Sequence, residues 1–421
     1  MTRIAVYADW EGLGGPIRLG FLHSRVAGAG EIFDFTYDDT ALNHSQAGAI
    51  QLDPRVALYP GHQYPPKGRA QFGAFSDSSP DRWGRLLMKR RQERMKREGG
   101  ASTATRLHES DYLLGVHDSY RSGALRFRRD DVGPFLDDAA EAAPPMVKLR
   151  ALQSAARILE DADQHSASKL DASLRMLIAP GGSLGGARPK ALVIDTDGSL
   201  WIAKFPSTRD THDVGGWEMV MHALAAGCGL NFAESDVKRF GSAYHTFLVR
   251  RFDRTDRGAR LHFASAMTLI DRTDGDDHSA GASYLELADV LIRSGSDTTQ
   301  DLRELWSRIV FNMLVSNTDD HLRNHGFLLK PGRGWTLSPA YDVNPDPYGD
   351  GLKLNVSESD NAQDLDLARE VAPYFRIKAA QANAIITDFV KIVSQWRNVA
   401  TALGIPTAEQ DLMSNAFRLA L

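Results

Sequence analysis

The sequence predicts an α/β fold of the α+β kind: a bilobal core with a largely helical C-terminal lobe, preceded by a small N-terminal accessory domain. Three observations predict it: short β-type segments between Gly-rich turns near the N-terminus, a Gly-rich loop that leads into two strands, and repeated helical apolar patterns over the last third. The 421 residues exceed one ordinary domain. With Pro144-Pro145 as a boundary, we expect an accessory domain at 1–145, an N-terminal lobe at 146–255 and a C-terminal lobe at 256–421.

The accessory domain is expected to combine an antiparallel start with one long basic helix. Apolar alternation predicts strands at 4–7, 17–23 and 31–37, and a helix from Pro80 to about Glu98. Between Arg82 and Arg97 this helix carries eight basic residues against one Glu. Such a helix could contact nucleic-acid phosphates, or it could be a solvated face whose long side chains pack on the domain. The residues alone leave both interpretations open.

The N-terminal lobe is expected to hold phosphate groups. Helices at 147–163 and 168–178 precede a Gly-rich loop, which runs into strands at 191–194 and 200–205. Glycines let main-chain N–H groups approach phosphate closely. Lys204 on the second strand is placed to reach such phosphates, and Glu218 on a predicted helix at 214–226 is a candidate to orient that Lys. The loop residues expected to contact nucleotide are Gly182, Ser183, Leu184, Gly185, Gly186 and Ala187.

The C-terminal lobe carries the most informative spacing in the chain. A buried helix is predicted at 302–316, followed by a loop with Asp319 and Asn324 five residues apart, and then by strands at 326–330 and 335–338. Asp342 comes directly after this hairpin. The same Asp-to-Asn spacing separates the base and one metal ligand of a protein-kinase catalytic loop, and a second metal-binding Asp follows there too.

This layout predicts that the bilobal core is kinase-like and acts on Mg²⁺-bound ATP. Phosphoryl transfer needs a carboxylate that orients a hydroxyl and hard oxygen ligands for Mg²⁺, which two Asp and one Asn supply in this order. His321 stands between them and is expected to shape the loop. Further helices are predicted at 283–294, 376–398 and 406–420, with an exposed loop at 271–282.

The chain also resembles the HipA-type serine/threonine kinases, the toxins of bacterial type II toxin–antitoxin modules. The resemblance lies in five core segments and two accessory segments. The core segments are Ser183-Leu-Gly-Gly-Ala-Arg-Pro-Lys190, Ala203-Lys-Phe-Pro206, Val249-Arg-Arg-Phe-Asp-Arg254, Asn317-Thr-Asp-Asp-His-Leu-Arg-Asn324 and Pro339-Ala-Tyr-Asp-Val343. The accessory segments are Phe75-Ser-Asp-Ser-Ser-Pro-Asp81 and Gly115-Val-His-Asp-Ser-Tyr-Arg-Ser-Gly-Ala-Leu125.

The resemblance implies roles for individual residues. Asp319 would be the catalytic base, and Asn324 and Asp342 the Mg²⁺ ligands. Lys204 would contact the ATP phosphates, while main chain from Arg250 to Phe252 would read adenine. Autophosphorylation of Ser183 would switch the enzyme off, because a phosphate in the loop repels ATP.

The resemblance also implies partners. A small helix-turn-helix antitoxin like HipB would bring the chain to DNA indirectly, and the protein substrate would be a translation factor such as an aminoacyl-tRNA synthetase. Two other functions stay open: a small-molecule or lipid kinase, and a non-catalytic corepressor acting with a DNA-binding antitoxin.

Composition excludes several other classes. The net charge of −5 speaks against a general nucleic-acid binder, and a single cysteine, Cys228, excludes a disulfide framework or a cysteine-based metal cluster. The thirteen histidines show no H-E-x-x-H pattern. Without a signal-like start or an apolar run of ~18–20 residues, we expect a cytoplasmic protein with no membrane contact.

Overall fold

The computed structural model describes residues 2–28, 30–45, 51–98, 106–129, 133–136, 143–178 and 186–420. The chain divides into two compact units. The first comprises Met1–Arg209 and Asp253–Ala264, and the second comprises Asp210–Phe252 and Ser265–Leu421. The mixed helix and strand content agrees with the expected α+β class. Domain boundaries at residues 145 and 255 stay a prediction.

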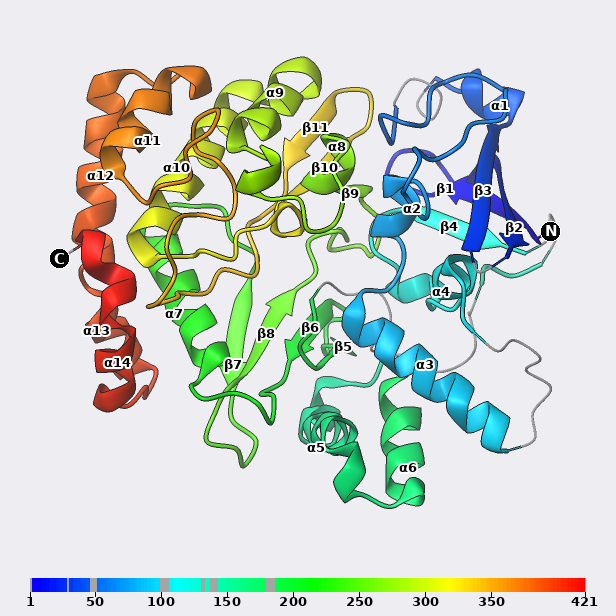
Figure 1. Ribbon diagram of the computed structural model, residues 1–421, viewed down its shortest axis with the longest axis horizontal. Helices are drawn as coiled ribbons and strands as arrows, with labels where there is room; N and C mark the ends of the chain where they lie inside the picture. Colours follow the sequence, from blue (N-terminus) through cyan, green and yellow to red (C-terminus); the bar gives the residue numbers. More distant parts are fainter. Residues whose placement is uncertain are drawn as a thin grey trace. The chain divides into compact units, whose positions relative to one another are not determined.

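The first unit begins with a four-stranded antiparallel sheet in the order β3-β2-β1-β4 (Figure 1). Its three predicted strands are confirmed, whereas β4 was not foreseen from the sequence. Gly20 is required in β2, because a Cβ there would lie 1.9 Å from the carbonyl oxygen of Thr36 on the paired strand. The strands are β1 (Thr2–Ala8), β2 (Ile17–Ala27), β3 (Gly30–Tyr37) and β4 (Leu125–Arg128).

Aromatic rings fill the space beside this sheet. Phe35 of β3 and Phe127 of β4 are buried, and the ring of Phe75 lies 5.5 Å and 6.2 Å from them between centroids. Phe72 packs edge-on against Phe75 at 5.8 Å. The short helix α2 (Gly73–Asp77) therefore brings the segment before the basic helix onto the sheet.

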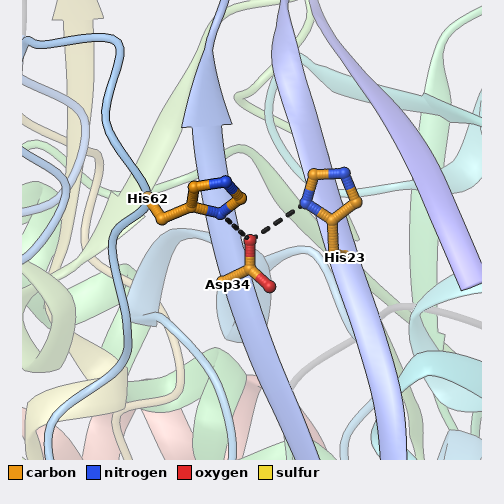
Figure 2. A group of neighbouring side chains, drawn as sticks. All are labelled: His23, Asp34 and His62. Atoms are coloured by element: carbon orange, nitrogen blue, oxygen red, sulfur yellow. Dashed lines mark hydrogen bonds and ion pairs between the residues drawn. The ribbon is translucent and has the colours of Figure 1, made fainter. Parts of the chain in front are cut away.

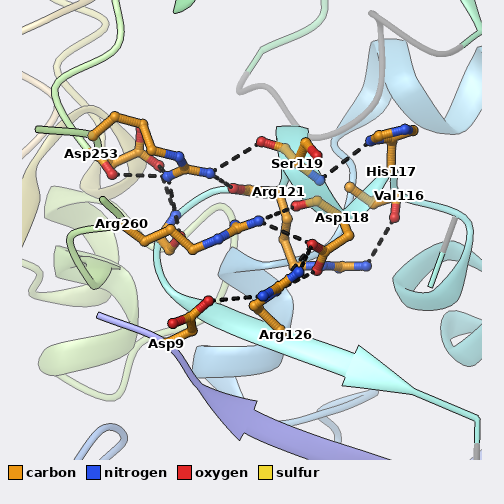
Figure 3. Close-up of polar contacts among 11 residues, drawn as sticks. Asp9, Val116, His117, Asp118, Ser119, Arg121, Arg126, Asp253 and Arg260 are labelled. Carbon is orange, nitrogen blue, oxygen red and sulfur yellow. Dashed lines mark hydrogen bonds and ion pairs between the residues drawn. The ribbon is translucent and has the colours of Figure 1, made fainter. Parts of the chain in front are cut away.

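A buried ion-pair network joins the returning segment Asp253–Ala264 to the rest of this unit (Figure 3). Asp118 is 3% exposed and accepts hydrogen bonds from Arg126 at 2.5 Å and from Arg260 at 3.1 Å. Arg126 also pairs with Asp9 at 2.9 Å. Because an isolated buried carboxylate is strongly destabilising, both guanidinium groups are needed to offset the desolvation of Asp118.

The predicted basic helix is confirmed as α3 (Arg82–Arg97), and at least half of its basic residues contact the surrounding helices or its own C-cap. Arg85 forms a bidentate pair with Glu109 at 2.5–2.7 Å, and Arg90 donates to the Leu159 carbonyl at 2.5 Å. Arg94 and Arg97 pair with Glu98 and Asp171. Arg82, Lys89, Arg91 and Lys96 are exposed. The helices of this unit besides α2 and α3 are α1 (Asp39–Leu42), α4 (Glu109–Leu114), α5 (Leu149–Glu160) and α6 (Ala167–Leu177).

The predicted strands after the Gly-rich loop form an antiparallel hairpin, β5 (Lys190–Ile194) and β6 (Leu200–Lys204). The indole nitrogen of Trp83 donates to the Lys190 carbonyl at 2.9 Å, which joins α3 to the hairpin within the first unit. The chain enters the second unit at Asp210, returns to the first unit at Asp253, and passes into the second unit again within β9 (Phe263–Ser265).

The second unit is largely helical, and its central helix is α10 (Thr298–Val315). The residues from Leu305 to Val315 are buried throughout, and the Trp306 indole donates to the Ala368 carbonyl at 2.8 Å. The other helices are α7 (Val214–Gly227), α8 (Ala266–Leu269), α9 (Tyr284–Ser294), α11 (Leu365–Val371), α12 (Ala379–Val393), α13 (Trp396–Ala402) and α14 (Thr407–Met413). The strands pair as hairpins β7 (Ser235–Lys238) with β8 (Thr246–Arg250), and β10 (Gly326–Lys330) with β11 (Gly334–Leu337).

Two helix predictions in this unit are wrong. The segment 406–420 is not one α-helix, because α14 ends at Met413 and a 3-10 helix follows at Ser414–Ala420. The segment 376–398 is not one helix, because α12 ends at Val393 and α13 starts at Trp396. The break lets the Trp396 ring stack on Phe417 at 4.3 Å and approach Trp217 at 6.0 Å. Burial of this large ring outweighs the continuity of the helix.

Across the part of the chain that the structure describes, no helix is both long enough and apolar enough to span a lipid bilayer.

Candidate active site

The loop that carries Asp319 and Asn324 starts from a fixed point at the end of α10. Ser316 adopts a left-handed conformation (φ 49°) and is fully buried. Its hydroxyl donates to the Ala416 carbonyl at 2.8 Å and accepts from Arg418 at 2.9 Å. A non-glycine residue in this conformation needs such support, because the left-handed region is disfavoured by about 1–2 kcal/mol.

Asp320 forms the buried centre of this loop. Its Oδ2 accepts hydrogen bonds from the Tyr284 hydroxyl at 2.7 Å, the Asn312 amide at 2.7 Å and His325 Nε2 at 2.9 Å. Burial would raise the pKa of this carboxyl, yet His325 and the other donors hold the pKa below its usual value. Asp320 therefore stays ionised and ties α9, α10 and the residue before β10 to the loop.

Asp319 is placed very differently from its neighbour. Its side chain is exposed, and its carboxylate makes no hydrogen bond or ion pair with any residue that the structure describes. Only its main-chain carbonyl is engaged, accepting from His321 N at 2.8 Å and from the Asn324 amide at 3.1 Å. Of the two adjacent aspartates, Asp320 holds the loop and Asp319 is available to an outside group.

Asn324 and His321 complete the turn. Because Asn324 Nδ2 donates to Asp319, its Oδ1 is left as a candidate metal ligand. The Asn324 N–H also donates to the His321 carbonyl at 2.8 Å. His321 Nδ1 is buried and has no hydrogen-bond partner within the described residues, so His321 supports the loop through its main chain.

Asp342 belongs to a segment that is hydrogen-bonded to this loop. It has a left-handed backbone (φ 60°), which Asp tolerates better than most residues. The preceding Tyr341 hydroxyl donates to the Arg323 carbonyl at 2.8 Å, and the Asn344 N–H donates to Asn317 Oδ1 at 3.3 Å. The two motif segments are therefore fixed against each other within the second unit.

Glu218 and Asp342 line the same small pocket in the second unit. Glu218 lies on α7 and is 5% exposed. The segment after α7 reaches Asp342 through a parallel bridge between Phe232 and Ala340, in which Ala233 N donates to the Ala340 carbonyl at 3.1 Å. Carboxylate groups on the lining suit a hard cation or the cationic end of a lysine.

Arg250 is the last residue of β8, and Phe252 lies two residues later. The Arg250 N–H donates to the Glu234 carbonyl at 2.8 Å, and its guanidinium pairs with the Glu234 carboxylate at 3.2 Å. The Phe252 ring lies 5.4 Å from the Tyr341 ring. The expected hinge segment is thus connected to the segment that carries Asp342.

The remaining predicted residues belong to the first unit or lie outside the described residues. Lys204 is the last residue of β6 and stands opposite Lys190 of β5 in the hairpin register. The buried Lys190 ammonium lies 3.7 Å from the Asp81 carboxylate. Gly186 has φ 89°, and a Cβ there would lie 3.0 Å from Lys190 Nζ. Ala187 is exposed. Gly182, Ser183, Leu184 and Gly185 lie outside the described residues.

Sequence reasoning missed the partners of Asp320. Tyr284 and His325 were not singled out, although both complete the buried network. His325 stands directly before an apolar strand, and a polar residue beside a buried strand is the signal that could have revealed it.

The donor set fits Mg²⁺, because the Asn324 oxygen and the Asp342 carboxylate are hard oxygen ligands on segments joined by hydrogen bonds. The arrangement can therefore orient a hydroxyl at Asp319 and hold a cation nearby on the adjacent segment.

Comparisons with known proteins support the same family. The model of the HipA-like C-terminal domain matches residues 182–396. A putative kinase of Haemophilus influenzae is 31% identical over 24% of this chain and 32% of its own length. Putative kinase Y4dM of Sinorhizobium fredii is 28% identical over 48% of this chain and 52% of its own length. The serine/threonine-protein kinase toxin HipA of Shewanella oneidensis is 25% identical over 42% of this chain and 45% of its own length. The chain thus spans about half or less of the length of these curated relatives.

A solved structure extends the likeness of fold to nearly the whole chain. A chain of the Shewanella oneidensis HipA, HipB and operator DNA complex matches with a TM-score of 0.63 and 15% identity. The match covers 99% of this chain and 96% of that chain.

Proposed function

We propose, since this chain belongs to the family of the HipA-like C-terminal domain, that it is a serine/threonine-protein kinase that transfers the γ-phosphoryl group of ATP to a protein hydroxyl. The observation that carries the proposal is the contrast between two adjacent aspartates. Asp320 is buried and accepts three hydrogen bonds, which leaves Asp319 exposed at the head of a rigid loop. A catalytic base must be positioned firmly and yet be open to substrate.

The proposed reaction assigns Asp319 to the substrate hydroxyl. The hydroxyl oxygen forms a bond to the γ-phosphorus, the bond from that phosphorus to the β,γ-bridging oxygen breaks, and ADP leaves. The hydroxyl proton passes to the Asp319 carboxylate. Because phosphoryl transfer depends mainly on positioning and electrostatics, the value of Asp319 lies in orienting the hydroxyl.

Asn324 and Asp342 would hold Mg²⁺, which neutralises charge on the phosphates. The hydrogen bonds from Tyr341 and Asn344 support this assignment, because they fix the Asp342 segment to the loop of Asn324. We assign Lys204 to the ATP phosphates, with Glu218 as its orienting partner, and the main chain from Arg250 to Phe252 to adenine.

We also propose that Ser183 is the autophosphorylation site that switches the enzyme off. The measurement is phosphopeptide mapping with intact mass, before and after Mg-ATP, on the wild type beside Asp319→Asn. Phosphate on Ser183 in the wild type alone supports both the kinase and the switch. Absence of phosphate in both would contradict autophosphorylation and favour a small-molecule kinase or a corepressor.

For partners, we propose a HipB-like helix-turn-helix antitoxin, with DNA reached through it, and an aminoacyl-tRNA synthetase or another translation factor as substrate. The support is likeness of fold to the HipA of a complex that contains HipB and operator DNA. Phosphate transferred to one purified synthetase by the wild type, and not by Asp319→Asn, would identify the substrate.

A further inference from the structure

Two histidines and an aspartate meet on the N-terminal sheet, in a place that the proposed kinase reaction does not use (Figure 2). His23 on β2 stands directly opposite Asp34 on β3 in the antiparallel register, so both side chains point to the same face. His62 reaches the same carboxylate from a loop that follows later in the chain.

Hydrogen bonds of the residue after His62 hold His62 at this place. The next residue, Gln63, exchanges two main-chain hydrogen bonds of 2.9 Å with Phe35, the neighbour of Asp34. The buried Gln63 side chain donates to the Ala57 carbonyl at 2.8 Å and accepts from the Ala57 N–H at 2.6 Å. The loop is therefore held by its own hydrogen bonds and by those to β3, which is one of the two outer strands of the sheet.

The three ligand atoms have the spacing of a metal site. Both rings turn Nδ1 toward one carboxylate oxygen, with His23 at 3.0 Å and His62 at 2.7 Å from Asp34 Oδ2, and all ligand atoms lie within 4.8 Å of one another. Tetrahedral zinc with bonds of about 2.0–2.1 Å places its ligands about 3.3 Å apart. Small side-chain shifts suffice to reach that geometry.

We propose that His23, Asp34 and His62 bind a divalent transition-metal ion, with Zn²⁺ as the ion of choice. Two imidazoles and one carboxylate suit Zn²⁺ and related metals and are unsuited to Mg²⁺ or Ca²⁺, which prefer oxygen. Three protein ligands leave a fourth position for water, and the side chain of His62 is 61% exposed, so the ion can enter from solvent.

Nearby guanidinium groups oppose binding and are already engaged; that of Arg18 lies 4.8 Å from the centre of the Phe21 ring and pairs with Asp38. Arg3 stands opposite His23 in the register between β1 and β2, and its guanidinium lies 3.5 Å from the centre of the Phe21 ring. Cation–π contact holds that charge over the ring. The bound ion would clamp the loop of His62 to the edge of the sheet.

The test is metal uptake by the full, untagged chain in the Asp319→Asn background, which removes ATP turnover from the readout. The key variant is His62→Asn, because Asn keeps an N–H donor for Asp34 and is a far poorer metal ligand. The control is His165→Asn, which removes a half-buried histidine elsewhere in the same unit.

We expect the parent and His165→Asn to bind one more equivalent of Zn²⁺ than His62→Asn, measured by competition with a chromophoric chelator. Affinity at this site should fall at least about tenfold in His62→Asn, and bound Co²⁺ should lose its tetrahedral visible absorption. Equal uptake and equal affinity in all three proteins would overturn the proposal.

Thermal unfolding provides a second readout. Zn²⁺ should raise the Tm of the parent and of His165→Asn, and leave that of His62→Asn unchanged, because a ligand stabilises only the state that binds it. The same rise in all three would mean that the metal acts elsewhere. If His23→Asn folds, it should behave as His62→Asn does.

Discussion

The hydroxyl of Tyr341 donates a hydrogen bond to the main-chain carbonyl of Arg323 at 2.8 Å. Arg323 precedes Asn324 and Tyr341 precedes Asp342, so this one bond couples the positions of both proposed Mg²⁺ ligands. The coupling lies entirely within the second unit.

Removal of this hydrogen bond should loosen the proposed metal site. Tyr341→Phe keeps the ring contact with Phe252 and loses only the hydroxyl, which should decrease stability by about 1 kcal/mol. We expect a higher Mg²⁺ requirement for autophosphorylation, measured by titrating Mg²⁺ at fixed ATP. Tyr348→Phe, on an 84% exposed side chain, is the control. An unchanged Mg²⁺ requirement in Tyr341→Phe would show that this hydrogen bond does not contribute to metal binding.

The two adjacent aspartates should respond in opposite ways. Asp319→Asn should lower phosphate transfer at least about 100-fold without changing the Tm, because its carboxylate makes no hydrogen bond or ion pair with the described residues. Asp320→Asn should destabilise the second unit by about 2–3 kcal/mol, since it removes a buried charge that accepts three hydrogen bonds. Denaturant unfolding and phosphate incorporation measure the two effects. Normal transfer by Asp319→Asn would rule out its role as base.

Asp342 can be tested with two substitutions that differ in backbone tolerance. Asp342→Asn tolerates the left-handed φ of 60° and loses the charged ligand, so activity should fall. Asp342→Ala should lose activity and also about 1 kcal/mol of stability from backbone strain. Thermal unfolding beside phosphate incorporation distinguishes these outcomes. Equal Tm values would show that the left-handed backbone contributes no strain.

Acid should weaken the first unit through His262. Burial lowers the pKa of this residue from 6.5 to about 4. Between those values the unfolded chain binds a proton that the folded chain does not. The contribution of His262 to the free energy of unfolding is therefore fully present above pH 6.5 and is lost as the pH falls to about 4. The decrease amounts to about 3 kcal/mol. Urea unfolding from pH 7 to pH 4.5 should show a smaller pH dependence in His262→Phe. Identical profiles would assign the acid sensitivity to other groups.

The exposed side of α3 can be tested for binding to nucleic acid. Lys89 and Arg91 are exposed, whereas Arg90 donates to the Leu159 carbonyl. If α3 meets phosphates in an antitoxin–DNA complex, Lys89→Glu with Arg91→Glu should reduce the salt slope of DNA binding by ~0.9 for each phosphate that the helix no longer neutralises. Lys67→Glu, at an exposed lysine outside α3, is the control for general charge. An unchanged slope in the double variant would favour a solvated face.

Local patterns predicted most of the elements near the site. The helical apolar pattern of 302–316 corresponds to α10, and the short strands on either side of a Pro-Gly turn correspond to β10 and β11. These predictions succeeded because periodicity and turn residues act over a few positions. The division between α12 and α13 was missed because it depends on Trp396 meeting Phe417, which lies 21 positions away.

The sequence by itself determined the order and spacing of the chemical groups: Lys204, Glu218, Asp319, Asn324 and Asp342 along the chain. Only the tertiary structure decided which of two adjacent aspartates is available, because the donors that bury Asp320 include Tyr284, 36 positions away. The same holds for His62, which meets Asp34 across 28 positions. Spacing is a property of the chain, whereas desolvation and hydrogen bonding depend on which distant side chains the fold brings together.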